Sequence, residues 1–273
     1  MHIFVKRLYI TAFCMLIISC VAAQNADTMI YRSQSVRSAG LGFPVLNYSL
    51  LSLLNHSGYS ANFHSIRFLD QSKYFTQFHL HFEIGMLYNN ANDSYITSLG
   101  FRCGWSRHRY VTERTRPLRL LLGGGVDTGV DIYMKEDNTN NPLAYFFNLS
   151  ASPDVLLKYH FATRQTRFEL GLQIDLPLIS IVSSSDYSSG LPYGFIESEA
   201  NFFDAMRVVS FGSLKKCMTI TTLDVMPSLE RRQKWPVFRV SYMFSGMNYS
   251  NGDFKIKSAD HVILLGVIFH LFR

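Results

Sequence analysis

The sequence lacks an apolar segment long enough to cross a membrane as a helix, once the first 23 residues are set aside. The longest mostly apolar run after that point, His261–Phe272, is shorter than the roughly 20 residues that a spanning helix needs. Only helices and closed barrels satisfy every backbone hydrogen bond in lipid. If the mature chain enters a membrane, it must therefore do so as a closed barrel.

The sequence also lacks a concentrated basic stripe. Lysine and arginine total 26 against 20 acidic residues, and the densest basic clusters, at residues 113–116 and 230–232, contain glutamate as well. A nucleic-acid-binding surface needs clustered positive charge, so the composition argues against a nucleic-acid partner.

Cysteine is scarce, and two of the four lie near the N-terminus at Cys14 and Cys20. Cys103 and Cys217 remain. They could pair in an oxidising compartment, or they could stay unpaired in a β-rich chain; the sequence favours the unpaired state.

The N-terminus has the features of an export signal. Lys6 and Arg7 precede a mostly apolar run from Leu8 to Ala23, as in secretory signal peptides. We favour cleavage after Ala23; a loose lipoprotein box ending at Cys20 is the alternative. The predicted organisation is a signal peptide over 1–23, an N-terminal periplasmic segment over 24–37 and an outer-membrane β-barrel over 38–273.

Strict alternation of apolar and polar residues indicates the fold. From Phe78 to Tyr88, and again from Thr166 to Ile181, every second residue is apolar and its neighbours are mostly polar or glycine. Several such runs hold for about 15 residues, whereas soluble strands are most often about 5–6 residues long and a tilted transmembrane strand needs about 9–11. We therefore predict an all-β, antiparallel transmembrane β-barrel of about 12 strands, exposed to lipid on its apolar face.

The predicted strands and turns form a consistent topology. With both termini periplasmic, the turns at 70–73, 162–165 and 203–205 are periplasmic, and the loops at 135–141 and 183–191 are extracellular and offer contact surfaces. Pro153 fits poorly inside its strand. The strands are expected near 40–54, 59–69, 74–88, 95–110, 118–134, 142–161, 166–182, 192–202, 206–213, 216–227, 236–249 and 256–272.

Charged and imidazole side chains fall on the polar face of these strands. Because unpaired buried charges are costly, residues of both signs should pair across the lumen, which favours a filled or narrowly gated interior over an open pore. The predicted lumen-lining residues are His79, His81, Glu83, Arg102, Arg119, Asp127, Asp131, Lys158, Arg167, Glu169, Asp175 and Arg239.

No motif supports a catalytic, cofactor or metal assignment. His79, His81 and Glu83 share one face at a spacing that could offer zinc ligands, but lumen-lining polarity is the simpler interpretation. Ser250 stands in a faint likeness to the serine motif of outer-membrane phospholipases, with Asn248 in place of the histidine; we interpret Asn251-Gly252 there as a hairpin turn. His56 and Ser57 point to opposite faces of a strand and cannot form a dyad with each other.

The chain resembles a family of uncharacterised exported barrel-like proteins of Gram-negative gut-type anaerobes, classed as a domain of unknown function. The resemblance covers most of residues 38–272 and implies an outer-membrane barrel with no assigned activity. It lies in Gly123-Gly124-Gly125, Asn140–Ala144, Ser152-Pro153, Glu169, Pro177-Leu178, Tyr193–Glu197, Met218–Thr221, His261 and Gly266.

These observations predict an outer-membrane protein with a structural, binding or narrow-solute role, whose partner is outer-membrane lipid. Its protein partners are unknown. Two alternatives stay open: a barrel-type lipid hydrolase, and a soluble or lipid-anchored secreted β-sandwich that binds a ligand.

Overall fold

The computed structural model describes residues 32–49, 51–91, 93–135, 143–163, 165–184, 206–227, 237–251 and 254–271. These ranges contain strands only, apart from turns and short connections. The strands are β1 (Arg32–Gly42), β2 (Val45–Tyr48), β3 (His56–Asp70), β4 (Tyr74–Asn89), β5 (Ser94–Tyr110), β6 (Leu118–Met134), β7 (Leu143–Ala162), β8 (Thr166–Asp175), β9 (Ile179–Ser184), β10 (Arg207–Ser210), β11 (Leu214–Pro227), β12 (Val237–Asn251) and β13 (Phe254–Leu271).

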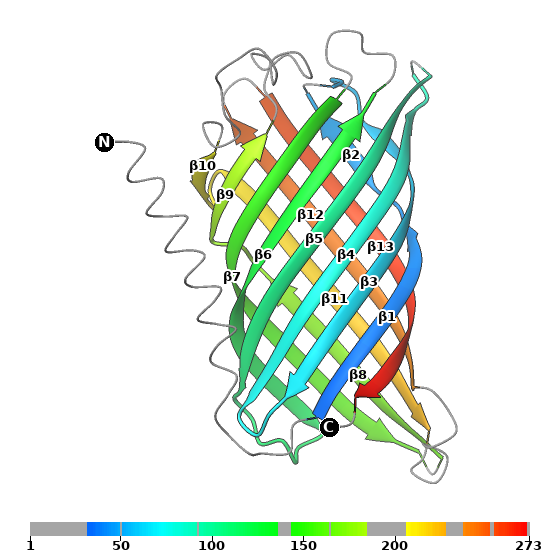
Figure 1. Ribbon diagram of the computed structural model, residues 1–273, viewed down its shortest axis with the longest axis vertical. Coiled ribbons are helices and arrows are strands. Elements are labelled where there is room, and N and C mark those ends of the chain that lie inside the picture. The colour runs from blue at the N-terminus through cyan, green and yellow to red at the C-terminus, as the bar shows by residue number, and fades with distance from the viewer. Residues whose placement is uncertain are drawn as a thin grey trace. The chain divides into compact units, whose positions relative to one another are not determined.

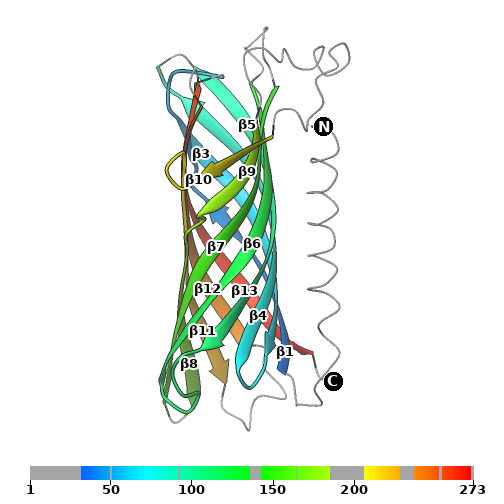
Figure 2. The same ribbon diagram turned by 90° about the vertical axis from the view of Figure 1, so that its left-hand side faces the viewer.

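Ten of these strands close into a ring. Antiparallel pairing runs β7-β6-β5-β4-β3-β1-β13-β12-β11-β8, and β8 pairs with β7 again. The strands cross the barrel wall obliquely, and the first and last strands lie side by side (Figures 1 and 2). The fold is an all-β, antiparallel, closed barrel. It is not the two-sheet sandwich that the sequence left open.

The short strands β2, β9 and β10 are not additional members of the ring. Each continues the path of a longer strand after an interruption. β2 follows β1 after Phe43-Pro44 and keeps the same neighbours, β13 and β3. β9 follows β8 after Pro177, and the interruption lies where Leu176 and Leu178 donate to the carbonyls of Pro153 and Ala151. Because proline lacks an N–H and interrupts the ladder, Pro153 is tolerated in β7 where its partner strand is itself broken.

The ring count corrects the predicted twelve strands. Segments 206–213 and 216–227 were predicted as two ring strands, but β10 pairs with β9 and β11 pairs with β8, so they follow one path along the wall. The predicted strand at 192–202 lies outside the described residues. β1 begins at Arg32, so the first barrel strand starts before the predicted boundary at residue 38.

Most other boundaries agree with the prediction. The connections at 71–73, 111–117 and 163–165 join β3 to β4, β5 to β6 and β7 to β8. The predicted turn at 203–205 and the predicted loops at 135–141 and 183–191 lie wholly or mostly outside the described residues. The β12–β13 hairpin pairs Asn251 with Phe254; Gly252 itself is not described.

The apolar face of the wall points outward, as predicted. Leu80, Phe82, Leu170 and Leu172 are all exposed large hydrophobic side chains, whereas their neighbours His81, Glu83, Gly171 and Gln173 are buried. The alternation therefore separates an apolar outer surface from a buried interior.

The two ends of the interior are also apolar, which the sequence analysis did not predict. The mouth layer, at the end opposite the barrel termini, is a buried cluster drawn from most strands of the ring: Leu46, Tyr48, Leu51, Leu87, Ile96, Tyr133, Ala144, Phe146, Val182, Leu214, Tyr249 and Ile256. The termini layer closes the other end and comprises Val36, Ile66, Phe68, Phe75, Leu121, Leu156, Val237 and Ile268. The barrel is thus filled with side chains at both ends.

Barrel closure between β1 and β13 depends on close backbone approach at Gly40. A Cβ at this position would overlap the Ile263 carbonyl oxygen, so Gly40→Ala requires β1 and β13 to move apart. We expect the free energy of unfolding to fall by roughly 1–3 kcal/mol. The measurement is the temperature to which a sample must be heated before its compact, folded species disappears from the gel, and this temperature should be lower for the variant. Gly212→Ala is the matched control, because the nearest atom to its Cβ would be 3.7 Å away; equal effects of the two substitutions would contradict the explanation.

Candidate functional site: the polar interior

Between the two apolar layers lies a continuous set of buried polar side chains, the polar interior. The inward face of β4 crosses it from one layer to the other and gives its order. From the termini layer to the mouth layer these inward residues are Phe75, Gln77, His79, His81, Glu83, Gly85 and Leu87.

Next to the termini layer, two ion pairs cover aromatic rings. Arg239 binds Asp224 through two hydrogen bonds, Nε to Oδ1 and Nη2 to Oδ2, both 2.6 Å long. Lys158 Nζ lies 3.1 Å from Glu169 Oε1 and 3.9 Å from the centre of the Phe75 ring. Bidentate, charge-assisted contacts of this kind are the strong class of hydrogen bond, so they join neighbouring strands where the polar interior begins.

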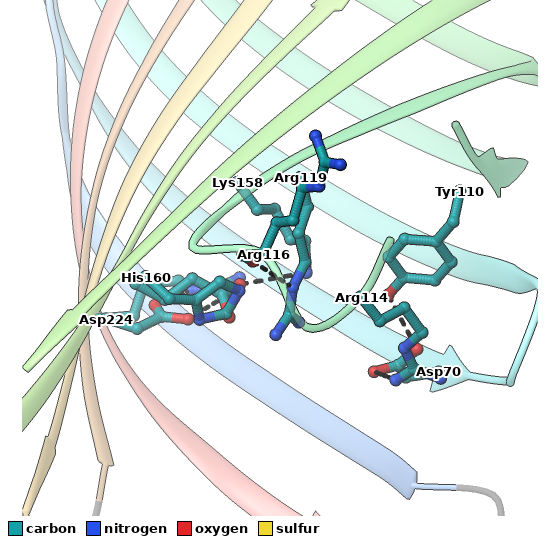
Figure 3. Close-up of polar contacts among 10 residues, drawn as sticks. Asp70, Tyr110, Arg114, Arg116, Arg119, Lys158, His160 and Asp224 are labelled. Carbon is teal, nitrogen blue, oxygen red and sulfur yellow. Dashed lines mark hydrogen bonds and ion pairs between the residues drawn. The ribbon is translucent and has the colours of Figure 1, made fainter. Parts of the chain in front are cut away.

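His160 extends this pairing toward the barrel end. Its Nδ1 lies 3.3 Å from Glu169 Oε2, on the carboxylate that Lys158 also contacts. Figure 3 shows Lys158 and His160, two residues apart on β7, with Asp224 beside His160.

The next contacts link opposite walls through amides. Gln77 Nε2 donates to Gln173 Oε1 at 2.8 Å, and Gln173 Nε2 donates to Asp154 Oδ2 at 2.6 Å. His108 Nε2 lies 2.8 Å from the same Asp154 oxygen, and both side chains are fully buried. A chain of polar contacts therefore crosses from β4 through β8 to β7 and β5.

Three histidines and a lysine occupy the centre. His79 Nε2 and Lys216 Nζ lie 3.3 and 3.0 Å from the two oxygens of Asp127. His81 Nε2 lies 2.8 Å from Asn62 Oδ1, and the His64 ring packs edge-on against both His79 and His81. Each described imidazole here has a protein neighbour that fixes its position.

A small cavity lies just beneath the mouth layer. It has a volume of about 40 Å³, and its lining includes Glu83, Asp131, Asp260 and Arg102. Arg102 Nη2 lies 3.6 Å from Asp131 Oδ1, and its Nη1 donates to Ser245 Oγ at 3.2 Å. Asp260 is 7% exposed, and no side chain among the described residues donates a hydrogen bond to its carboxylate. This volume accommodates a few water molecules at most.

Acidic side chains outnumber basic ones in the described part of the interior. Eight carboxylates share the space with four lysine or arginine side chains and five histidines. The carboxylates are those of Glu83, Asp127, Asp131, Asp154, Glu169, Asp175, Asp224 and Asp260, and the Lys/Arg set is Arg102, Lys158, Lys216 and Arg239. The described interior therefore carries more acidic than basic side chains, and each buried carboxylate depends on the few cations and polar groups around it.

The rim at the termini end has its own polar cluster. Arg114, in the 111–117 connection, contacts Asp70 Oδ2 at 2.7 Å and lies over the Tyr110 ring. Tyr110 donates to the other Asp70 oxygen at 2.9 Å; burial and the neighbouring Asp70 charge raise the pKa of Tyr110. Figure 3 shows this cluster apart from Arg119, whose Nε donates to the Arg116 carbonyl. These contacts hold the connection against the β3–β4 turn.

The structure places most, but not all, of the predicted lumen residues in the polar interior. Ten of the twelve lie in the polar interior, whereas Arg119 lies at the rim and Arg167 is exposed near the start of β8. Asp175 is buried and faces Asp154 across the β7–β8 ladder. The prediction omitted several partners of these residues, namely Asn62, His64, Gln77, His108, Asp154, Gln173, Lys216, Asp224 and Asp260; their strand parity could have identified them.

His79, His81 and Glu83 do not converge on one point, because His79 contacts Asp127 and His81 contacts Asn62. Among the residues that the structure describes, no group of three or more His, Cys, Asp or Glu side chains is placed to hold a metal ion.

His56 does meet a serine, although not Ser57. Its Nε2 lies 2.9 Å from Ser94 Oγ, and its Nδ1 lies 3.1 Å from the Leu54 carbonyl oxygen. The exposed fractions of His56 and Ser94 are 1% and 3%, so a substrate carbonyl has no access to the hydroxyl. This contact satisfies two buried polar groups where β3 meets β5, and we assign it no catalytic role.

Two further features bear on the earlier alternatives. Cys103 and Cys217 are both free. In the described ranges, no helix has the length and apolar character to span a membrane. The predicted signal peptide and the lipid-anchor alternative at Cys20 lie outside the described residues.

The fold and its interior define a closed, ten-stranded antiparallel barrel whose outer surface is apolar and whose lumen is filled. The outer membrane protease OmpT from Escherichia coli has a similar fold: TM-score 0.53, 8% identity, 90% of this chain and 99% of that chain covered. The transport unit of the autotransporter AIDA-I from Escherichia coli matches with TM-score 0.45 and 8% identity, covering 91% of this chain and 92% of that one.

Sequence comparison identifies the family. The chain belongs to a family described as proteins of unknown function, DUF3316, whose model matches residues 9–273. No curated protein matches the sequence significantly. The expected membership of a family without an assigned activity is confirmed.

The Arg239–Asp224 pair permits a direct test of how the interior contributes to stability. Asp224→Asn leaves a buried guanidinium without its counter-charge, and we expect a loss of about 3–5 kcal/mol in the free energy of unfolding. The double variant Arg239→Met with Asp224→Leu should recover much of that loss, since no charge remains buried. Urea unfolding of the refolded protein in detergent micelles measures both.

The control is Glu113→Gln, which breaks the pair with Arg116, where the side chains are 74% and 66% exposed. We expect a change below about 1 kcal/mol. An equal loss at Glu113 and Asp224 would show that burial does not determine the strength of these pairs.

Proposed function

We propose that the protein is an integral β-barrel of the Gram-negative outer membrane, exported by its N-terminal signal, that acts as a structural or binding protein with a sealed lumen. The observation that carries this proposal is the division of side chains by the closed wall, with large apolar groups outside and paired charges inside. In a water-soluble barrel this large apolar surface would be exposed to water, which is unfavourable.

Strand dimensions support residence in a bilayer. On β4 the exposed outward side chains run from Phe78 to Tyr88, a rise of about 33 Å along the strand. At a tilt of about 40–45° this covers roughly 25 Å, the usual height of the apolar band of a transmembrane barrel. Tyr88 and Tyr95 pack together at one edge of this band, and Trp105 lies opposite Phe78 at the other, where aromatic girdles occur.

The filled interior supports a role other than bulk solute passage. A permeating solute would have to displace the mouth layer, the polar interior and the termini layer in turn. The buried ion pairs resist displacement, because separating one member leaves an uncompensated charge. We therefore favour a structural or binding role over narrow solute passage.

Electrical recording tests the sealed lumen. Purified protein inserted into planar lipid bilayers should give no large, long-lived open conductance, because both apolar layers span the interior. A trimeric porin inserted in the same bilayers serves as the positive control. A stable, high conductance at low voltage would refute the sealed lumen while leaving the barrel assignment intact.

Membrane residence is tested separately, by fractionation and gel migration. The protein should stay with the membrane pellet after carbonate washing, and it should migrate differently before and after heating, because an intact barrel resists unfolding by detergent at room temperature. Release into the carbonate supernatant would contradict the outer-membrane proposal.

A further inference from the structure

Charge is divided by sign between the two faces of the barrel wall. Every aspartate and glutamate in the described strands lies on an inward-facing position, from Glu83 on β4 to Asp260 on β13, with Asp70 at the rim. The outward face of the described strands carries lysine and arginine but no carboxylate; these residues are Arg37, Arg67, Arg107, Arg109, Lys215, Lys255 and Lys257.

Three of these cations form one group, the lysine patch, at the end opposite the barrel termini. Lys215 on β11 is opposite Asn248 on β12, and Asn248 is opposite Lys257 on β13. Lys255 is two residues from Lys257 on the same strand and therefore on the same face. With strands about 4.8 Å apart and same-face neighbours about 6.5–7 Å apart, the three Cα atoms lie within roughly 10–12 Å of one another.

The lysine patch has no acidic partner among the described residues. All three side chains are exposed, and none forms an ion pair in the described part of the chain. Like charges gathered in this way repel one another, so the patch favours a multivalent anion. Further along the outward face of β13 lie the exposed apolar side chains Ile263 and Leu265. The anion that binds the patch should therefore also carry an apolar part.

We propose that the lysine patch binds the phosphate groups of the phosphorylated glycolipid that forms the outer leaflet of the outer membrane. This inference rests on the proposed function and on the expected periplasmic position of both barrel termini, which together put the patch at the extracellular end. Ammonium groups bind phosphate as point charges, and each lysine near an anionic membrane surface contributes about 1 kcal/mol. The glycolipid's acyl chains then lie against the apolar face below the patch, and the exposed Asn248 offers an amide donor in the same row.

Purified barrel in detergent, titrated with lipid A and observed by native mass spectrometry, tests this assignment. The lysine variant carries Lys215→Gln, Lys255→Gln and Lys257→Gln. The matched control carries Arg67→Gln, Arg107→Gln and Arg109→Gln, which removes the same charge from the outward face at the other end. We expect the lysine variant to bind bisphosphorylated lipid A at least about tenfold more weakly than wild type, and the arginine variant to change less than about threefold.

The lipid itself provides a second comparison. Dephosphorylated lipid A should bind wild type and the lysine variant equally weakly, because the contact is made through phosphate. The proposal is overturned if the two variants lose binding equally, if removing the phosphates has no effect, or if phosphatidylglycerol binds as tightly and is released by the same substitutions.

Heat-dependent gel migration of each variant separates the possible failures. Wild type that shows the migration shift but does not prefer bisphosphorylated lipid A refutes the lysine patch alone. Wild type without the shift refutes the membrane-barrel proposal and this inference with it.

Discussion

Closure of the backbone hydrogen-bond ring is the constraint on which the remaining structure depends. β1 and β13 are far apart in the sequence, yet they pair over ten residues each, and β7 pairs with β8 to complete the circle. A closed ring has no free strand edge, so its outer surface can be apolar without exposing unpaired backbone groups. Closure also creates an enclosed space, which must be filled by side chains or by water.

The side chains that fill this space form a layered core. Apolar layers close both ends, and charged and amide groups occupy the centre, where contacts such as Gln77–Gln173 and Asp127–Lys216 reach between strands. The polar centre fixes which side chains meet, because a buried charge tolerates few alternative partners. The apolar ends flank these contacts on both sides. A lumen organised in this way resembles the interior of a soluble protein more than a pore.

The sequence predicted the wall better than its contents. Alternation at period two identified long strands such as β4 to β8, because most outward residues across the membrane band are apolar and most inward ones are polar or glycine. It failed at strand ends: Leu87 and Phe146 lie on inward positions yet are apolar, so alternation stops there although the strand continues. The ring has ten strands where about twelve were predicted, because the turn at 211–213 interrupts one path along the wall without ending it. The pairings His79–Asp127 and Arg239–Asp224 depend on register between strands, which a single sequence does not encode in any local pattern.

The separation of charge across the wall also acts as a check on assembly. Shifting β4, β6 or β8 by one residue would turn its carboxylates toward hydrocarbon and its leucines into the charged centre, so each error would be unfavourable on both faces at once. A strand paired in the wrong register is therefore less stable than one in the correct register, because it places unfavourable side chains on both faces of the wall.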